Sequence, residues 1–251
     1  MPLLPTFQFA PLLVHLLVTW LKLDRPYLPT KLRHVKLQKI FAEFLGTALL
    51  LAAVIGSGIM ATNLSQDEGI QLTINAISIV SMLYLIITLF GPISGAHFNP
   101  VVTLGELFKN RIDSKNAVAY IVAQFLGGFC GTVFANLIFN KPAIFQSQHE
   151  RTGTNLFVSE IFATAGLVMI IHLLIDQERT NLAPYIIPAW ITTAFYATSS
   201  FVFANPAVTF ARIWSDSFAG ITLHSAWIYM IAQLIGLPLG LIVARLLFVR
   251  K

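Results

Sequence analysis

Six stretches of the chain are long, apolar and almost free of charge, and they restrict it to folds that lie inside a membrane. They cover residues 40–62, 70–90, 116–139, 156–175, 182–201 and 225–248. A helix of about 20 mostly apolar residues crosses a hydrocarbon core about 30 Å thick. The whole chain is 56% hydrophobic and 11% charged, whereas soluble domains are roughly 25% charged. We therefore expect an all-α membrane protein with six transmembrane helices.

The charge and cysteine content exclude several other classes of protein. The net charge is +5, but the basic residues flank the apolar stretches and form no separate patch that could bind nucleic acid. Cys130 is the only cysteine, which excludes a disulfide framework and a cysteine-based metal cluster. The sequence contains no Gly-Lys-Ser/Thr phosphate-binding loop and no recognisable pair of nucleophile and base. We expect no enzyme activity, no metal and no cofactor.

Lysine and arginine are distributed unequally between the two predicted faces of the membrane. Only Lys141, Arg151 and Arg212 lie on one face, and the other thirteen of the 16 lie on the opposite face. Cytoplasmic loops are the richer in basic residues, so we expect both termini in the cytoplasm. Together with the compact loops, this favours a bacterial inner membrane. Residues 1–37 are expected to form a cytoplasmic or surface-lying arm, because their apolar run at 10–21 is too short to cross.

The two halves of the chain repeat each other. Residues 42–48 resemble 159–165, residues 99–104 resemble 205–210, and residues 123–127 resemble 232–236. The first repeat covers residues 38–139 and the second 155–250, with three crossing helices in each. Because three is odd, the second copy must lie upside down in the membrane. Inverted repeats that meet at half-length helices are typical of transporters and channels, whose site lies near the midplane.

Two shorter segments, 99–108 and 205–214, are predicted to be half-length helices that begin at Asn-Pro. In an inverted repeat they enter from opposite faces and meet at their N-termini. A helix N-terminus carries about half a positive charge and unpaired N–H groups, so two facing ends oppose cations and protons. Asn99 and Asn205 can cap their own half-helices and still donate an amide N–H to a passing oxygen.

The motifs at 94–103 and 203–209, with the opening at 42–47, resemble the aquaporin family, also called the major intrinsic proteins. The resemblance covers residues 38–250 and implies the aquaporin fold, in which six transmembrane helices enclose two re-entrant half-helices. It implies a homotetramer with one pore per subunit and passive conduction of water or small neutral solutes. The channel domain is then 38–251. The residues at the pore centre would be Asn99, Pro100, Val101, Asn205, Pro206 and Ala207, with Val101 where the family usually has alanine.

The outer selectivity filter departs from the family pattern. In most members the second motif continues as Asn-Pro-Ala-Arg, but here Val208 stands at the arginine position. Counting back from the two asparagines without gaps places the other filter positions at Ile79 and Thr193, with Val202 in the loop. Arg212 lies one helical turn after Val208, so it faces the same side nearer the outer mouth. Filters without arginine resemble those of a bacterial subgroup linked to arsenic resistance.

Glu43 and Glu160 occupy matching positions in the first and fourth apolar stretches. Carboxylates at membrane depth are costly and usually functional. We expect them to brace the re-entrant loops by accepting hydrogen bonds from backbone N–H groups that have no water available. A site for a transported ion is the alternative. His97, just before Asn99, either lines the cytoplasmic pore mouth or braces its loop.

The favoured function is a passive channel for water and small uncharged solutes. With a permissive filter these include glycerol-like polyols, arsenite-type neutral hydroxy acids and hydrogen peroxide. One alternative is an ion-coupled secondary transporter, which would need charged residues near the midplane; the second and fifth stretches have none. The other alternative is a structural membrane protein of the same fold with a closed pore.

Overall fold

The computed structural model describes residues 30–248, in which the only regular secondary structure is helical. The helices are α2 Thr30–Leu64, α3 Glu68–Ser94, α4 Pro100–Phe108, α5 Ser114–Ile138, α6 Thr154–Asp176, η1 Thr180–Leu182, α7 Ala183–Ala197, α8 Pro206–Arg212 and α9 Leu223–Leu247. The pattern of contacts between residues divides the chain into two units, with the boundary between Lys36 and Leu37. Since the first unit is described only at the start of α2, the account below concerns residues 37–248. The apolar run expected to lie on the membrane surface, at 10–21, is outside the described residues.

Within the described part of the chain, five helices are long and apolar enough to cross a membrane: α2, α3, α5, α6 and α9. The remaining predicted span, the fifth, corresponds to α7, which is shorter than expected because it ends at Ala197 and not at residue 201. The residues that follow are rich in hydroxyl groups, and Ser199 hydrogen-bonds Ser159 on α6 (Oγ to Oγ 3.0 Å). Such side chains compete with the helical hydrogen bonds, so the chain leaves the helix early and reaches Asn205 as a loop.

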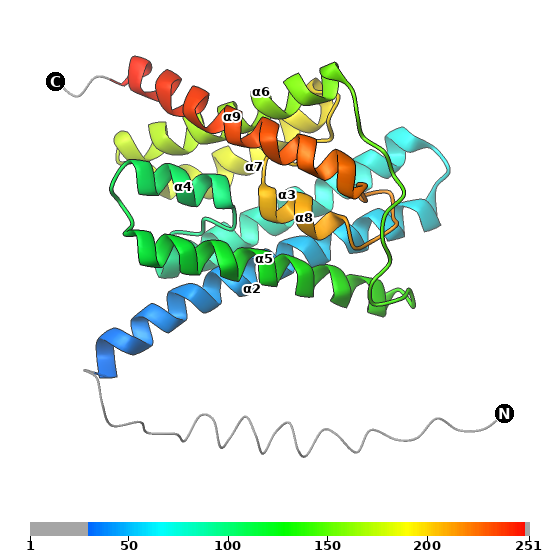
Figure 1. Ribbon diagram of the computed structural model, residues 1–251, viewed down its shortest axis with the longest axis horizontal. Coiled ribbons are helices and arrows are strands. Elements are labelled where there is room, and N and C mark those ends of the chain that lie inside the picture. Colours follow the sequence, from blue (N-terminus) through cyan, green and yellow to red (C-terminus); the bar gives the residue numbers. More distant parts are fainter. Residues whose placement is uncertain (1–29, 249–251) are drawn as a thin grey trace. The chain divides into compact units, whose positions relative to one another are not determined.

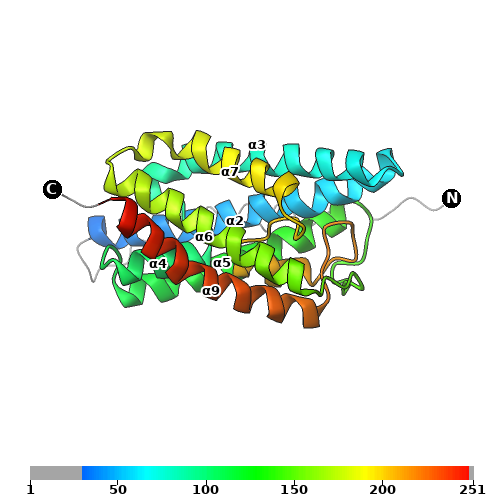
Figure 2. The same cartoon turned by 90° about the horizontal axis from the view of Figure 1, so that it is seen from above.

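The two half-helices lie inside the bundle, between α5 and α9 (Figure 1). Each of α4 and α8 contacts α5, α9 and the other half-helix. Around them, α3 and α7 pack side by side (Figure 2), and α6 makes its most extensive contact with α9. Both half-helices thus lie at the centre of the packed helices, as an inverted repeat would place them.

Glycines at equivalent positions of α5 and α9 permit close helix packing. A Cβ atom at Gly131 would overlap the backbone carbonyl oxygen of Ala48 on α2. A Cβ atom at Gly240 would lie 2.5 Å from the carbonyl oxygen of Ala165 on α6. The glycines one turn earlier, Gly127 on α5 and its partner on α9, also face backbone carbonyls. Small residues at this spacing let membrane helices cross closely, so both halves use the same seam.

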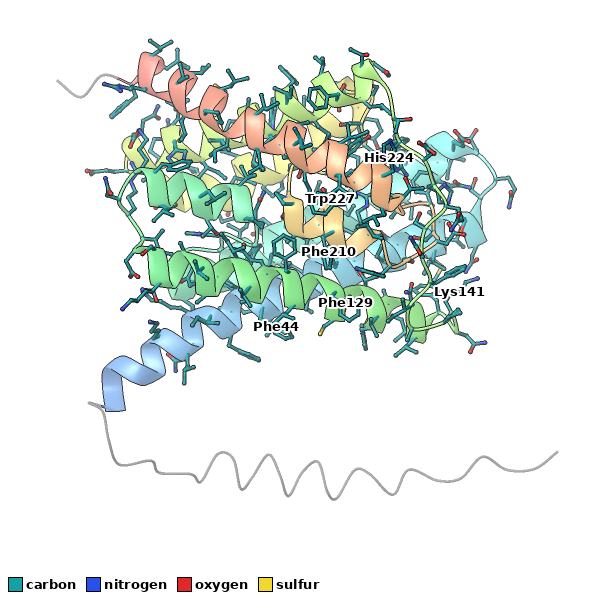
Figure 3. All side chains as sticks on the ribbon, in the orientation of Figure 1. Phe44, Phe129, Lys141, Phe210, His224 and Trp227 are labelled. Carbon is teal, nitrogen blue, oxygen red and sulfur yellow. The ribbon has the colours of Figure 1, made fainter. Side chains whose placement is uncertain are left out.

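The outward faces of the helices are apolar. Trp227 on α9, labelled in Figure 3, points outward and is 60% exposed. Leu89 on α3 and Leu126 on α5 are 62% and 55% exposed. Water-soluble monomers rarely expose apolar surface on this scale. These faces are therefore suited to contact with lipid, and the fold is that of a membrane protein.

Candidate functional site: the central cavity

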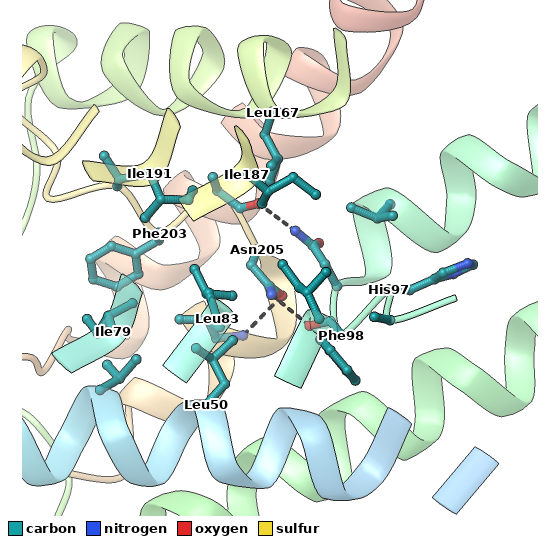
Figure 4. Close-up of a pocket in the computed structure, with 18 of the residues that line it drawn as sticks. Leu50, Ile79, Leu83, His97, Phe98, Leu167, Ile187, Ile191, Phe203 and Asn205 are labelled. Atoms are coloured by element: carbon teal, nitrogen blue, oxygen red, sulfur yellow. Dashed lines mark hydrogen bonds between the residues drawn. The ribbon is translucent and has the colours of Figure 1, made fainter. Parts of the chain in front are cut away.

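A narrow cavity of about 80 Å³ runs between the re-entrant loops and four helices (Figure 4). One wall is a row of α7 residues spaced four apart, Ile187, Ile191 and Phe195, which the helical repeat places on one face. Apolar residues of α2, α3 and α6 form the rest of the helical wall: Leu50, Val54, Ile79, Leu83, Ile87, Leu167 and Ile171. The helices thus supply an apolar surface, and most of the polar groups come from the loops and half-helices.

A larger cavity of about 600 Å³ adjoins the narrow one. Both are lined by Ala96, His97 and Val102. The narrow cavity extends from there to Arg212, and the larger one to Glu106. His97 therefore lies where the two spaces meet.

Asn99 and Asn205 tie the two half-helices together at their N-termini. The side-chain Oδ1 of each accepts a backbone N–H from its own half-helix, that of Val101 at 2.9 Å and that of Ala207 at 3.0 Å. Each Nδ2 donates across the centre to a carbonyl oxygen of the other loop at 2.8 Å (Figure 4). An amide nitrogen has two hydrogens, so one N–H per asparagine is left for the cavity that both residues line.

The other four residues assigned to the pore centre are buried but do not line either cavity. Pro100 and Pro206 are the first residues of α4 and α8, where the missing N–H costs nothing. Val101 packs away from the cavity against Val168 and Leu237. These residues fix the start of each half-helix, whereas the asparagines face the path.

Both re-entrant loops contain residues in the left-handed region of backbone space. The φ angles are 53° at Ala96 and 48° at Phe98, and 42° at Val202 and 46° at Ala204. These pairs are equivalent in the two repeats. A non-glycine residue in this region costs roughly 1–2 kcal/mol, so strong contacts must hold the loops in place.

Glu43 and Glu160 provide such contacts from behind the loops. The Glu160 carboxylate accepts the backbone N–H groups of Phe203 (3.0 Å) and Ala204 (2.9 Å). Glu43 accepts the equivalent groups of the first loop, at 3.0 and 2.7 Å, and also the Ser94 hydroxyl at 2.6 Å. Both carboxylates are fully buried and neither lines a cavity. This placement suits loop bracing and not a site for a transported ion.

Two glutamines complete the bracing, and the sequence analysis did not assign them a role. Gln124 Nε2 donates to Glu43 (2.8 Å) and to the Thr103 hydroxyl (2.9 Å). Gln233 makes the same two bonds in the second repeat, to the second glutamate and to the threonine of α8, at the same distances. The sequence does carry a signal for this shared role, because both glutamines lie in the matching segments 123–127 and 232–236.

Three of the four predicted filter residues line the narrow cavity, and one does not. Ile79, Val202 and Val208 are buried in its wall. The assignment of Thr193 is wrong, since its side chain is exposed and its hydroxyl bonds the carbonyl oxygen of Ala189 within α7. Ile191, two residues earlier, faces the cavity in its place. A gap-free count fixes chain distance from the motif but not the rotation of α7.

Arg212 and His97 lie at the two ends of the narrow cavity. Arg212 is 3% exposed, and its guanidinium carbon lies 3.4 Å above the ring of Phe203. His97 Nδ1 lies 3.1 Å from the Thr103 hydroxyl, and its ring packs edge-on against Tyr120. His97 thus both lines the path and contacts the bracing groups, so its two expected roles coincide.

Glu106 is a further polar residue of the path that the sequence analysis missed. Its carboxylate lies 3.3 Å from Nη1 of Arg111 and 3.5 Å from Nδ1 of His172. Arg111 also pairs with Asp176 at the end of α6. This cluster ties the end of α4 to α6 beside the larger cavity.

Comparison with known proteins assigns this architecture to a family. The family model of the major intrinsic proteins matches residues 31–204. This chain belongs to the major intrinsic protein family. Among its relatives, Aquaglyceroporin AqpS of Rhizobium meliloti (strain 1021) is 40% identical over 208 residues, which cover 83% of this chain and 89% of that protein. Glycerol uptake facilitator protein-like 6 of Lactiplantibacillus plantarum is 28% identical over 225 residues, 84% and 98% of the two chains.

A solved structure agrees with this membership of the major intrinsic proteins. The aquaglyceroporin from Plasmodium falciparum superposes with a TM-score of 0.64, over 84% of this chain and 97% of the other. At 22% sequence identity, this likeness concerns the fold. The aquaporin fold expected from the Asn-Pro motifs is therefore confirmed.

Proposed function

We propose that this major intrinsic protein is a passive transmembrane channel for water and small uncharged solutes. The observation that carries the proposal is the pair of asparagines at the opposed N-termini of α4 and α8, each with one amide N–H left for the cavity. Such donors bind the oxygen of a neutral molecule, while two positive half-helix ends repel cations and protons. The family membership supports the same function.

The solutes we propose are water, glycerol-like polyols, hydrogen peroxide and undissociated arsenite-type hydroxy acids. Relatives named as an aquaglyceroporin and as a glycerol uptake facilitator-like protein support the polyols. The apolar filter at Val208 supports the larger neutral solutes, and it is the feature that resembles the arsenic-linked subgroup. Coupling to an ion is disfavoured, because no described residue that lines the narrow cavity is a carboxylate.

The setting we propose is a homotetramer in a bacterial inner membrane, with both termini in the cytoplasm. The excess of lysine and arginine on one face supports this orientation. Arg212 then faces the outside and Glu106 the cytoplasm. We propose no enzyme activity and no cofactor, with residues 1–37 as an arm outside the channel domain.

The test is light scattering of proteoliposomes after an osmotic step. Vesicles with the channel should shrink faster than empty vesicles in sucrose, and in glycerol they should re-swell as the solute enters. Vesicles in which the correctly folded protein conducts neither water nor any solute would favour the closed-pore alternative. Uptake that requires an ion gradient would favour the transporter.

A further inference from the structure

Charge selection at the outer end of this pore needs a group that the filter positions do not supply. Between the asparagine pair and the outer mouth, Ile79, Ile191 and Val208 form an apolar wall. An apolar wall selects by size and offers neither charge nor donors to distinguish a cation from a neutral molecule of the same shape. The inference below rests on the proposed function, because it concerns which solutes that pore refuses.

Arg212 is the one described cation that lines the narrow cavity, apart from the histidine at its far end. It ends α8, one turn beyond Val208. Its Nε donates to the carbonyl oxygen of Ala219, and its planar group stacks on Phe203. A guanidinium over an aromatic face is attracted by the ring quadrupole, so the side chain is fixed in position.

The charge of Arg212 interacts with that of Glu160 at a distance, but no carboxylate of residues 30–248 forms an ion pair with it. Within the same residues, the two terminal nitrogens of Arg212, Nη1 and Nη2, have no hydrogen-bond partner. Unlike the buried side-chain atoms that lack a partner, they are not fully enclosed by protein atoms. The N–H groups are therefore open to the cavity, and both the charge and the donors are available to a solute.

A second guanidinium, that of Arg151, also lies near Phe203 but does not line the pore. The guanidinium carbon of Arg151 lies 4.8 Å from the ring centre of Phe201 and 5.7 Å from that of Phe203. Its Nε and Nη2 donate to the carbonyl oxygens of Gly220 and Phe218. Burial lowers the pKa of Arg151, but a guanidinium stays protonated at neutral pH. Arg151 thus braces the loop that carries Ala219, without lining either cavity.

We propose that Arg212, positioned by Phe203, is the charge-selective residue of the outer filter. Selection is then divided between two levels of the pore, about 5 Å apart along α8. Ile79, Ile191 and Val208 set the size limit, and Arg212 repels cations one turn further out. The division lets the pore be wide for neutral solutes and still exclude positive ones.

The test compares acetamide with acetamidinium, a neutral molecule and a cation of nearly the same size and shape. Arg212→Gln removes the charge and can keep a donor to Ala219. We expect it to raise acetamidinium uptake into proteoliposomes by about ten-fold, the scale of one nearby charge in a medium of intermediate polarity. Acetamide uptake should change much less. Arg212→Lys keeps the charge and should keep the exclusion.

The matched control is Lys141→Gln, which removes an exposed cation of the same predicted membrane face that lines neither cavity. It should leave the ratio of the two uptakes unchanged. The double variant Val208→Arg/Arg212→Gln returns a guanidinium to the family's usual level and should restore cation exclusion.

Three results would overturn the inference. They are a folded Arg212→Gln with the wild-type ratio, an equal rise in Lys141→Gln, and wild-type protein that admits both probes alike. Failure of the proposed function looks different, because the wild type would then pass neither water nor acetamide. If Arg212→Gln does not fold, leakage of acetamidinium through Arg212→Lys equal to that of acetamide overturns the inference, and exclusion by Arg212→Lys supports it.

Discussion

Glu106 and Arg212 stand at equivalent positions, seven residues after the asparagine of each half-helix, and carry opposite charges. Glu106 lies within 3.5 Å of nitrogens of Arg111 and His172, whereas Arg212 has no carboxylate partner among residues 30–248. The backbone of the two halves repeats, but the charge does not. An uncompensated positive potential is therefore expected at one mouth only, the one where solute meets Arg212.

Asn99→Asp and Asn205→Asp should each reduce water permeability by about ten-fold or more. A carboxylate at a half-helix N-terminus offsets its positive end and replaces the donor that now binds the opposite loop at 2.8 Å. The measurement is the osmotic rate per reconstituted channel. The matched control is Asn75→Asp, because Asn75 is also buried and donates to Val54, but does not line either cavity. Normal conduction by both pore variants would contradict the midplane site.

Glu43→Gln should lower the free energy of unfolding by about 3 kcal/mol, because an amide nitrogen would face N–H donors that the carboxylate now accepts. Glu160→Gln should cost less, since Glu160 lacks the hydroxyl bond that Ser94 gives to Glu43. Denaturant unfolding in detergent measures both. The ratio of water to glycerol permeability should stay unchanged in the folded fraction. A large change in that ratio would place Glu43 on the conduction path.

Much of this site could be predicted from the sequence, because the inverted repeat constrains each element twice. The two Asn-Pro motifs locate the half-helices and their caps. The matching glutamates indicate what holds the loops. A motif that recurs at symmetric positions of one chain is much less often a chance match than a motif that occurs once.

Two predictions about α7, its end and the residue it presents to the cavity, are wrong for physical reasons that are local to this helix. A span predicted by hydropathy continues to residue 201, but α7 ends at Ala197, and Ser199 beyond it bonds Ser159 of α6. Which α7 residues face the cavity depends on how that helix is rotated against α3 and α6. Neither effect can be read from the number of residues that separate a position from Asn205. The gap-free count therefore predicts Thr193 in the cavity wall, where the structure has Ile191. Glu106 was not predicted, because its environment also depends on His172 of α6, which lies far along the chain.

Ile191→Ala should widen the filter, whereas Thr193→Ala should not. Ile191 lines the narrow cavity and Thr193 is exposed. Removing the larger part of a buried isoleucine from a cavity wall adds room on the scale of several methyl groups. We expect glycerol uptake to rise several-fold in Ile191→Ala, by roughly the discrimination that a few methylenes provide, and to stay at the wild-type level in Thr193→Ala. A rise in the threonine variant alone would restore the gap-free assignment.

Val208→Arg should cut glycerol uptake roughly ten-fold more than water flow, because the guanidinium adds bulk, charge and donors in the wall of the narrow cavity. Ile191 lines the cavity where the sequence predicted Thr193. The room for an arginine at position 208 is therefore smaller than expected, and the uptake of larger solutes should fall most. Proton leakage should stay low, since the half-helix ends still face each other.

Val208→Met adds a long apolar side chain without charge and separates bulk from polarity. It should slow water and glycerol together, because it offers no donor to water. Water, glycerol and arsenite permeabilities are measured for all three proteins in the same vesicle preparation. Equal losses of water and glycerol in Val208→Arg, or identical behaviour of the arginine and methionine variants, would show that Val208 does not set the filter as we propose.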